Sequence, residues 1–94
     1  MDRNILLDLL KEENYPTNMV DSTIKKLEQL QPDIKSAFML WMSDGNNPTI
    51  TIEGYSFIDL TSKYGMTPIG AFITLDWLKR NPEKASKALK RGIR

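Results

Sequence analysis

The chain of 94 residues carries 13 Lys and Arg against 12 Asp and Glu, and 40% of its residues are apolar. This size and composition are typical of one globular domain that buries a single core. The sequence contains neither cysteine nor histidine, which excludes thiolate nucleophiles, Ser-His pairs and the commonest transition-metal ligand. We therefore expect a protein that is not an enzyme and that uses no metal and no cofactor.

The first 30 residues predict two amphipathic helices. Apolar residues recur at helical spacing over 3–13, and the turn around Pro16 ends this first helix. Asn18, followed three residues later by Asp21, resembles a capping box, so a second helix should start there. The apolar stripe of that helix runs to Leu30, and its charged residues lie off the stripe.

A third helix is predicted over 32–42, and an extended segment should follow it. Pro32 suits the first turn of a helix, where a missing N–H group costs nothing, and Gly45 is a natural stop. Turn-forming residues fill 43–48, the best candidate for a hinge. Residues 49–52 alternate and are β-branched, which favours an extended conformation. With no second strand evident, we expect a short extended connector.

Two further helices are predicted around a Gly turn. Ser56, with an acid three residues later, marks the start of a short helix that Gly65 closes. The next helix, 68–80, is apolar around most of its circumference, so other helices should surround it. Its apolar surplus either belongs wholly to the core or forms a patch for a protein partner or a second copy. The candidate partner-binding residues are Ile69, Phe72 and Ile73.

A last helix is predicted from Pro82 to about Gly92, with Asn81 as its cap. Its cations gather on the side opposite its apolar residues, whereas residues 1–48 hold eight acids and five bases. The basic side chains either keep the surface soluble or attract phosphates or an acidic partner. The candidate contacts are Lys79, Arg80, Lys84, Lys87, Lys90, Arg91 and Arg94.

Segment 60–75 resembles the helix-turn-helix domains that bind DNA. Apolar, small, turn and small residues stand where that motif has them, at Leu60, Thr61, Gly65 and Ala71. The resemblance implies that the second helix enters the major groove, with Thr67 suited to a base edge. Phe72 can read little beyond a thymine methyl group. The alternative is a structural corner whose second helix is buried.

The sequence thus predicts a single all-α domain over 1–94, with five or six short helices around helix 68–80. No apolar stretch approaches the roughly 20 residues that span a bilayer, so we expect a cytoplasmic protein with no membrane contact. A protein-protein interaction or self-association module is the preferred function, and a nucleic-acid-binding protein with a basic last helix is the alternative. The aromatic residues expected in the core are Phe38, Trp41, Phe57, Phe72 and Trp77.

Overall fold

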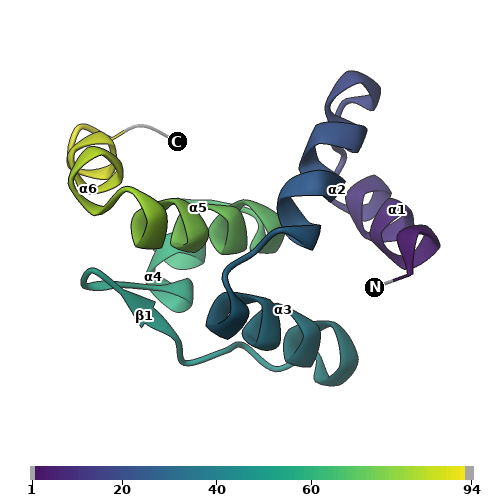
Figure 1. The fold of residues 1–94 in the computed structure, drawn as a ribbon, viewed down its shortest axis with the longest axis horizontal. Helices are drawn as coiled ribbons and strands as arrows, with labels where there is room; N and C mark the ends of the chain where they lie inside the picture. The colour runs from purple at the N-terminus through teal and green to yellow at the C-terminus, as the bar shows by residue number, and fades with distance from the viewer. Residues whose placement is uncertain (1, 93–94) are drawn as a thin grey trace.

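A central apolar helix organises the computed structural model, which describes residues 2–92. In chain order its elements are α1 (Arg3–Glu12), the 3-10 helix η1 (Thr17–Met19), α2 (Val20–Glu28), α3 (Pro32–Asp44), β1 (Thr51–Ile52), β2 (Tyr55–Ser56), α4 (Phe57–Ser62), α5 (Pro68–Arg80) and α6 (Pro82–Lys90). Helix α5 contacts α2, α3, α4, α6 and β1 (Figure 1). The predicted all-α bundle around helix 68–80 is confirmed.

Apolar side chains from all six α-helices of the described residues fill one core. Phe38, Phe57 and Phe72 are fully buried, and the ring of Phe72 lies 5.1 Å from Phe38 and 4.7 Å from Phe57, centroid to centroid. These distances lie in the favourable range for aromatic pairs. The two tryptophans differ from the prediction, because Trp41 and Trp77 are only half-buried at the margin of this core.

The starts of the helices were predicted with mixed success. Ser56 caps α4, and its Oγ accepts a hydrogen bond of 3.0 Å from the backbone N–H of Asp59, as the sequence pattern predicts. The predicted capping box at Asn18 is wrong. Instead η1 covers that position and feeds directly into α2, whose N-cap is Met19 without a side-chain cap bond. The tight turn that follows Pro16 replaces the expected cap.

Residues 49–52 do not form the isolated connector that the sequence predicts. Strand β1 pairs with β2 in an antiparallel hairpin, with Thr51 opposite Ser56. The two turn residues, Glu53 and Gly54, have φ values of 52° and 82°. Positive φ at both positions is typical of the two-residue turn that matches the twist of a hairpin. Glu-Gly is a weaker signal for this turn than Asn-Gly, so the partner strand was missed.

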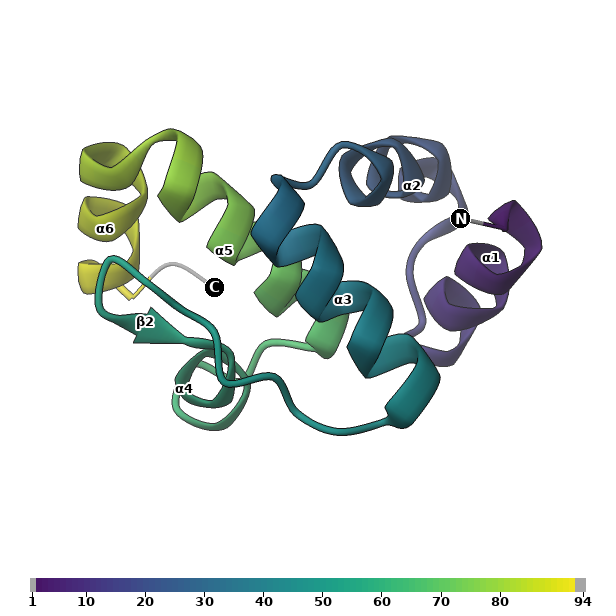
Figure 2. The same cartoon turned by 60° about the horizontal axis from the view of Figure 1, so that its bottom comes forward.

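The first helix, α1, and the last helix, α6, lie at opposite ends of the molecule. Helix α6 lies at one end of the long axis and α1 at the other, in both views (Figures 1 and 2). The acid-rich first half of the sequence forms α1, α2 and α3, whereas the basic residues Lys84, Lys87 and Lys90 lie in α6. The charge asymmetry of the sequence is therefore also an asymmetry in space.

Candidate binding surfaces

Two of the three residues predicted to bind a partner are buried. Ile69 and Phe72 have no exposed surface and belong to the core, so a partner cannot reach them in the folded chain. Each residue of a helix is rotated by about 100° from the previous one. Ile73 therefore lies on another side of α5, half-buried and facing the end of α2. The prediction is corrected: only Ile73 remains a candidate contact.

Trp77 lies one turn beyond Ile73 and lines two hollows. The larger, of about 460 Å³, lies between the C-terminal ends of α2 and α5 and is also lined by Leu30. The smaller, of about 300 Å³, lies against α6 and is also lined by Ala88. Basic side chains line both hollows, namely Lys26, Arg80, Lys84, Lys87 and Arg91. We call these five cations, with Leu30, Ile73, Trp77 and Ala88, the Trp77 surface.

A hydrogen-bonded network fixes the larger hollow. Asp76 Oδ2 accepts from Arg80 Nε at 2.7 Å, and Asp76 Oδ1 accepts from the backbone N–H of Gln31 at 2.8 Å. Arg80 also donates to the carbonyl oxygen of Gln29. The Asp76 side chain is only 15% exposed, so these charge-assisted bonds are less weakened by water than those of a surface ion pair. The network joins α5 to the connection between α2 and α3.

Two of the seven cations predicted to contact phosphates or an acidic partner already have partners within the chain. Lys79 Nζ lies 2.7 Å from Asp33 Oδ2, and Arg80 pairs with Asp76. The hydrogen bond from Lys79 holds the pKa of Asp33 below its ordinary value, while partial burial opposes this shift. These two cations are therefore less available to an external anion than their place in the sequence suggests.

The other predicted cations lie on or after α6. Lys84, Lys87 and Arg91 belong to the Trp77 surface, and no carboxylate of residues 2–92 lies within 4.0 Å of them. Lys90 is exposed on α6 but lines neither hollow. Arg94 lies outside the described residues. Together with Arg80, four of the seven predicted cations are thus brought together around one tryptophan.

The second tryptophan, Trp41, also lines two hollows. One, of about 420 Å³, lies between α1 and the end of α3, and the other, of about 460 Å³, lies between α3 and segment 46–50. Apolar side chains in these hollows include Ile5, Leu9, Leu40 and Met42. The charged side chains that line them are all acidic: Asp8, Glu12, Asp33 and Asp44. We call these eight residues and Trp41 the Trp41 surface.

The N-terminus of α5 is occupied from within the chain. The carboxylate of Glu13 accepts from the backbone N–H of Ile69 at 3.3 Å. Burial raises the pKa of Glu13 above its ordinary value, and hydrogen bonds from Thr67 and Ile69 offset only part of this shift. In a helix-turn-helix domain this end of the second helix would face DNA. The helix-turn-helix resemblance of segment 60–75 stays a prediction. DNA bound there would meet the carboxylate of Glu13 at the N-terminus of α5.

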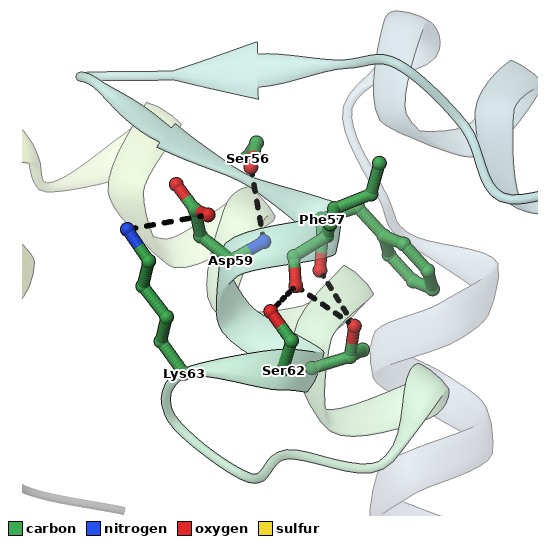
Figure 3. A network of polar contacts seen from close by, with 7 residues as sticks. Ser56, Phe57, Asp59, Ser62 and Lys63 are labelled. Atoms are coloured by element: carbon green, nitrogen blue, oxygen red, sulfur yellow. Dashed lines mark hydrogen bonds and ion pairs between the residues drawn. The ribbon is translucent and has the colours of Figure 1, made fainter.

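The hydroxyl groups of α4 bond to the helix itself (Figure 3). Ser62 Oγ donates to the carbonyl oxygen of Ile58 at 2.7 Å, and Thr61 Oγ1 lies 3.1 Å from the carbonyl oxygens of both Phe57 and Ile58. A hydroxyl becomes a nucleophile when a base accepts its proton. A backbone carbonyl is no such base, so these contacts are structural.

No group of three or more acidic side chains that could hold a metal ion occurs within residues 2–92. None of the helices that the structure describes is both long and apolar enough to cross a bilayer. In comparisons with known proteins, no family model, curated protein or solved structure matches this chain. The two surfaces are therefore the basis for a functional proposal.

Neither tryptophan was predicted to bind a partner, and Lys26 was not predicted to do so either. A signal was nevertheless present, because tryptophan is large and amphipathic and is rarely buried completely. In the sequence Trp77 is followed closely by Lys79, Arg80 and Lys84. Tryptophan and arginine are both enriched at protein interfaces, whereas lysine is depleted there.

Proposed function

We propose that this protein is a non-catalytic interaction module that binds an acidic, amphipathic protein segment through the Trp77 surface. One observation carries the proposal. Two apolar side chains of α5, Ile73 and Trp77, line hollows whose cations include three on or just after α6 with no carboxylate partner in the described residues. Concave apolar sites with a few well-placed polar groups are typical of binding sites.

The chemistry of this surface suits a protein partner. Tryptophan is enriched among the residues that contribute most to interface affinity, because it loses much water-exposed apolar area when a partner covers it. Trp77 is half-buried before binding, so its side chain is already positioned and loses little conformational entropy. Lys84, Lys87 and Arg91 would attract carboxylates and orient the partner.

The same cations support nucleic-acid binding as the alternative function. A single-stranded base could stack on Trp77 while the lysines contact phosphates. Three observations favour a protein segment. Lys79 and Arg80 are already ion-paired, Asp76 lines the larger hollow, and Leu30 and Ile73 give an apolar lining that phosphates cannot use.

Tryptophan fluorescence tests the proposal directly. In a Trp41→Phe variant, Trp77 is the remaining tryptophan and reports on its own surface. The probes are an acidic amphipathic peptide of Glu, Leu and Phe, the same peptide with Lys in place of Glu, and single-stranded DNA. We expect a saturable blue shift with the acidic peptide that weakens as salt screens the charges. The basic peptide should give no shift.

A matched pair of variants sharpens this test. Lys87→Glu changes the Trp77 surface, whereas Lys90→Glu makes the same change on α6 outside both hollows. Lys87→Glu should weaken the acidic peptide by roughly tenfold, and Lys90→Glu much less. The proposal is wrong if the acidic peptide does not bind, or if both variants weaken it equally. Tighter binding of single-stranded DNA than of the peptide would favour the alternative function.

A further inference from the structure

The Trp41 surface resembles the Trp77 surface in build and opposes it in charge. Each surface has one half-buried tryptophan that lines two hollows. The charged residues lining the Trp41 hollows are all acidic, whereas those around Trp77 are basic except for Asp76, which is paired with Arg80. Such opposition of charge is what brings protein surfaces together in a defined orientation.

The acidic side chains of the Trp41 surface are mostly available. Asp8, Glu12 and Asp44 have no cation within 4.0 Å among residues 2–92, and only Asp33 is paired, with Lys79. All four side chains belong to exposed residues on α1 and α3. They can therefore approach external cations without breaking an internal ion pair, except at Asp33.

The Trp41 surface also exposes large apolar side chains. Leu40 is 62% exposed and Ile5 is 55% exposed, and they line the two hollows on either side of Trp41. Single exposed apolar residues are ordinary, but several grouped around a half-buried tryptophan are typical of a contact surface. Covering them would remove apolar area from water and stabilise a complex.

The overall charge of the chain does not oppose contact between copies. Its formal net charge is +1, so two molecules repel each other little at long range. The positive surface is built from α2, α5 and α6, and the negative surface from α1, α3 and the segment after α3. Helix α6 of the positive surface and α1 of the negative surface lie at opposite ends of the long axis (Figures 1 and 2), whereas α2 lies beside α1. The attraction should therefore be strongest when the α6 end of one copy faces the α1 end of another.

We propose that the Trp77 surface of one copy binds the Trp41 surface of a second copy, head to tail. This inference rests on the proposed function and names its partner as a second copy of this chain. The contact is heterologous, because two different surfaces meet. An open assembly keeps one free Trp77 surface at one end and one free Trp41 surface at the other, so it grows with concentration or closes into a ring.

The assembly should depend on salt as well as concentration. Charged groups separated by more than about 10 Å are largely screened at 0.1 M salt, so added salt should weaken the end-to-end attraction. Sedimentation velocity of the full chain at low salt should show species larger than a monomer that increase with protein concentration. A chain that remains monomeric at its highest soluble concentration in low salt would overturn the inference.

Two surface variants test which surfaces meet. The double variant Lys84→Glu/Lys87→Glu replaces two cations of the Trp77 surface by acids. Leu40→Arg replaces an apolar side chain of the Trp41 surface by a cation. All three positions are exposed, and circular dichroism checks that both variants fold. Each variant alone should assemble at least roughly tenfold more weakly than the natural chain. An equimolar mixture keeps one intact pair of surfaces, so it should form a 1:1 dimer and nothing larger.

The mixing result distinguishes a head-to-tail contact from a symmetric contact between two identical surfaces. If a variant still assembles alone, or if the mixture stays monomeric, the head-to-tail contact is wrong. Failure of the proposed function is a different result, because it is seen as absence of acidic-peptide binding to the Trp41→Phe variant. A natural chain that stays monomeric while that variant binds the peptide would overturn only the inference about the second copy.

Discussion

The Trp77 and Trp41 surfaces share a plan but differ in how the chain supports them. The Trp77 surface is bordered by helix ends that the bonds of Asp76 hold together. The Trp41 surface is bordered on one side by segment 46–50, which has no regular secondary structure. A preorganised surface loses less entropy on binding, whereas a surface beside an irregular segment can adjust its shape. We therefore expect the basic surface to be the more rigid of the two and the acidic surface to be the more adaptable.

Among the substitutions that compare the two surfaces, the largest loss of stability should come from Phe72, whose ring packs against that of Trp41. Its ring centroid is 5.6 Å from that of Trp41, and its side chain is fully buried. Phe72→Ala should lower the free energy of unfolding by about 3–5 kcal/mol, because it removes a large buried side chain and leaves a cavity. Chemical denaturation followed by circular dichroism measures the change.

The neighbouring residue is the matched control. Ile73 is half-buried, so Ile73→Ala should cost only about 1 kcal/mol. Equal losses for the two variants would mean that the core does not extend beneath Trp41 as the structure places it. In the Phe72→Ala variant the fluorescence of Trp41 should also shift to longer wavelength, because Trp41 loses its ring contact with Phe72 and becomes more exposed to water. The contacts of Trp77 should not change.

Smaller losses of stability should distinguish Asp76 and Asp33, the two carboxylates that pair with cations of α5. Asp76→Asn removes the charge that bonds Arg80 and the backbone of Gln31. Because Asp76 is largely buried, the expected loss is about 1–3 kcal/mol in the free energy of unfolding. Asp33→Asn breaks only a half-exposed pair with Lys79, so its expected loss is less than about 1 kcal/mol.

The Asp76 variant should also change the Trp77 surface itself. Without the network, the end of α2 is less firmly held against α5, and binding of the acidic peptide should weaken. Asp33→Asn should leave peptide binding unchanged, because Asp33 lines the other surface. If both variants lose the same stability and bind the peptide equally well, the network does not organise the larger hollow.

The features of the fold that could be predicted are those that depend on residues close together in the sequence. Helix periodicity, Ser56 as a cap and Gly45 as a stop are short-range features, so the bundle and its central helix were predictable. The bond from Gln31 to Asp76 joins residues 45 positions apart, and nothing in the local pattern indicates it. Long-range pairings of this kind depend on the packing of whole helices.

The exposure of the two tryptophans also depends on long-range packing and could not be predicted. Helical spacing placed Trp41 and Trp77 on apolar faces, and both do contact the core. Whether the outer edge of such a face stays exposed depends on how closely the next helix approaches. The candidate site was therefore only partly predictable: the cations of α6 were identified, but the tryptophan they surround was assigned to the interior.

The smallest expected effect concerns Glu13, a carboxylate that lines neither surface. Burial raises its pKa in the folded chain above the ordinary value of 4.5, so folding favours the protonated form. Its contribution to stability is then fully present below the ordinary pKa and is lost as pH rises through the raised value. At neutral pH the ionised carboxylate costs stability, although its bond to the backbone of Ile69 offsets part of that cost.

Glu13→Gln removes the charge and keeps an oxygen that can accept from Ile69. We expect Tm at neutral pH to rise by about 1–4 °C, and the gain to shrink as pH falls through the raised pKa of Glu13. Asp33→Asn should show the opposite sign, because Lys79 lowers the pKa of Asp33 and that stability is lost as pH falls. Thermal melts of the three proteins from neutral to acidic pH measure both trends. A lower Tm for Glu13→Gln at neutral pH would mean that attraction to the N-terminus of α5 outweighs desolvation. Since the change touches neither tryptophan surface, assembly and peptide binding should stay as in the natural chain.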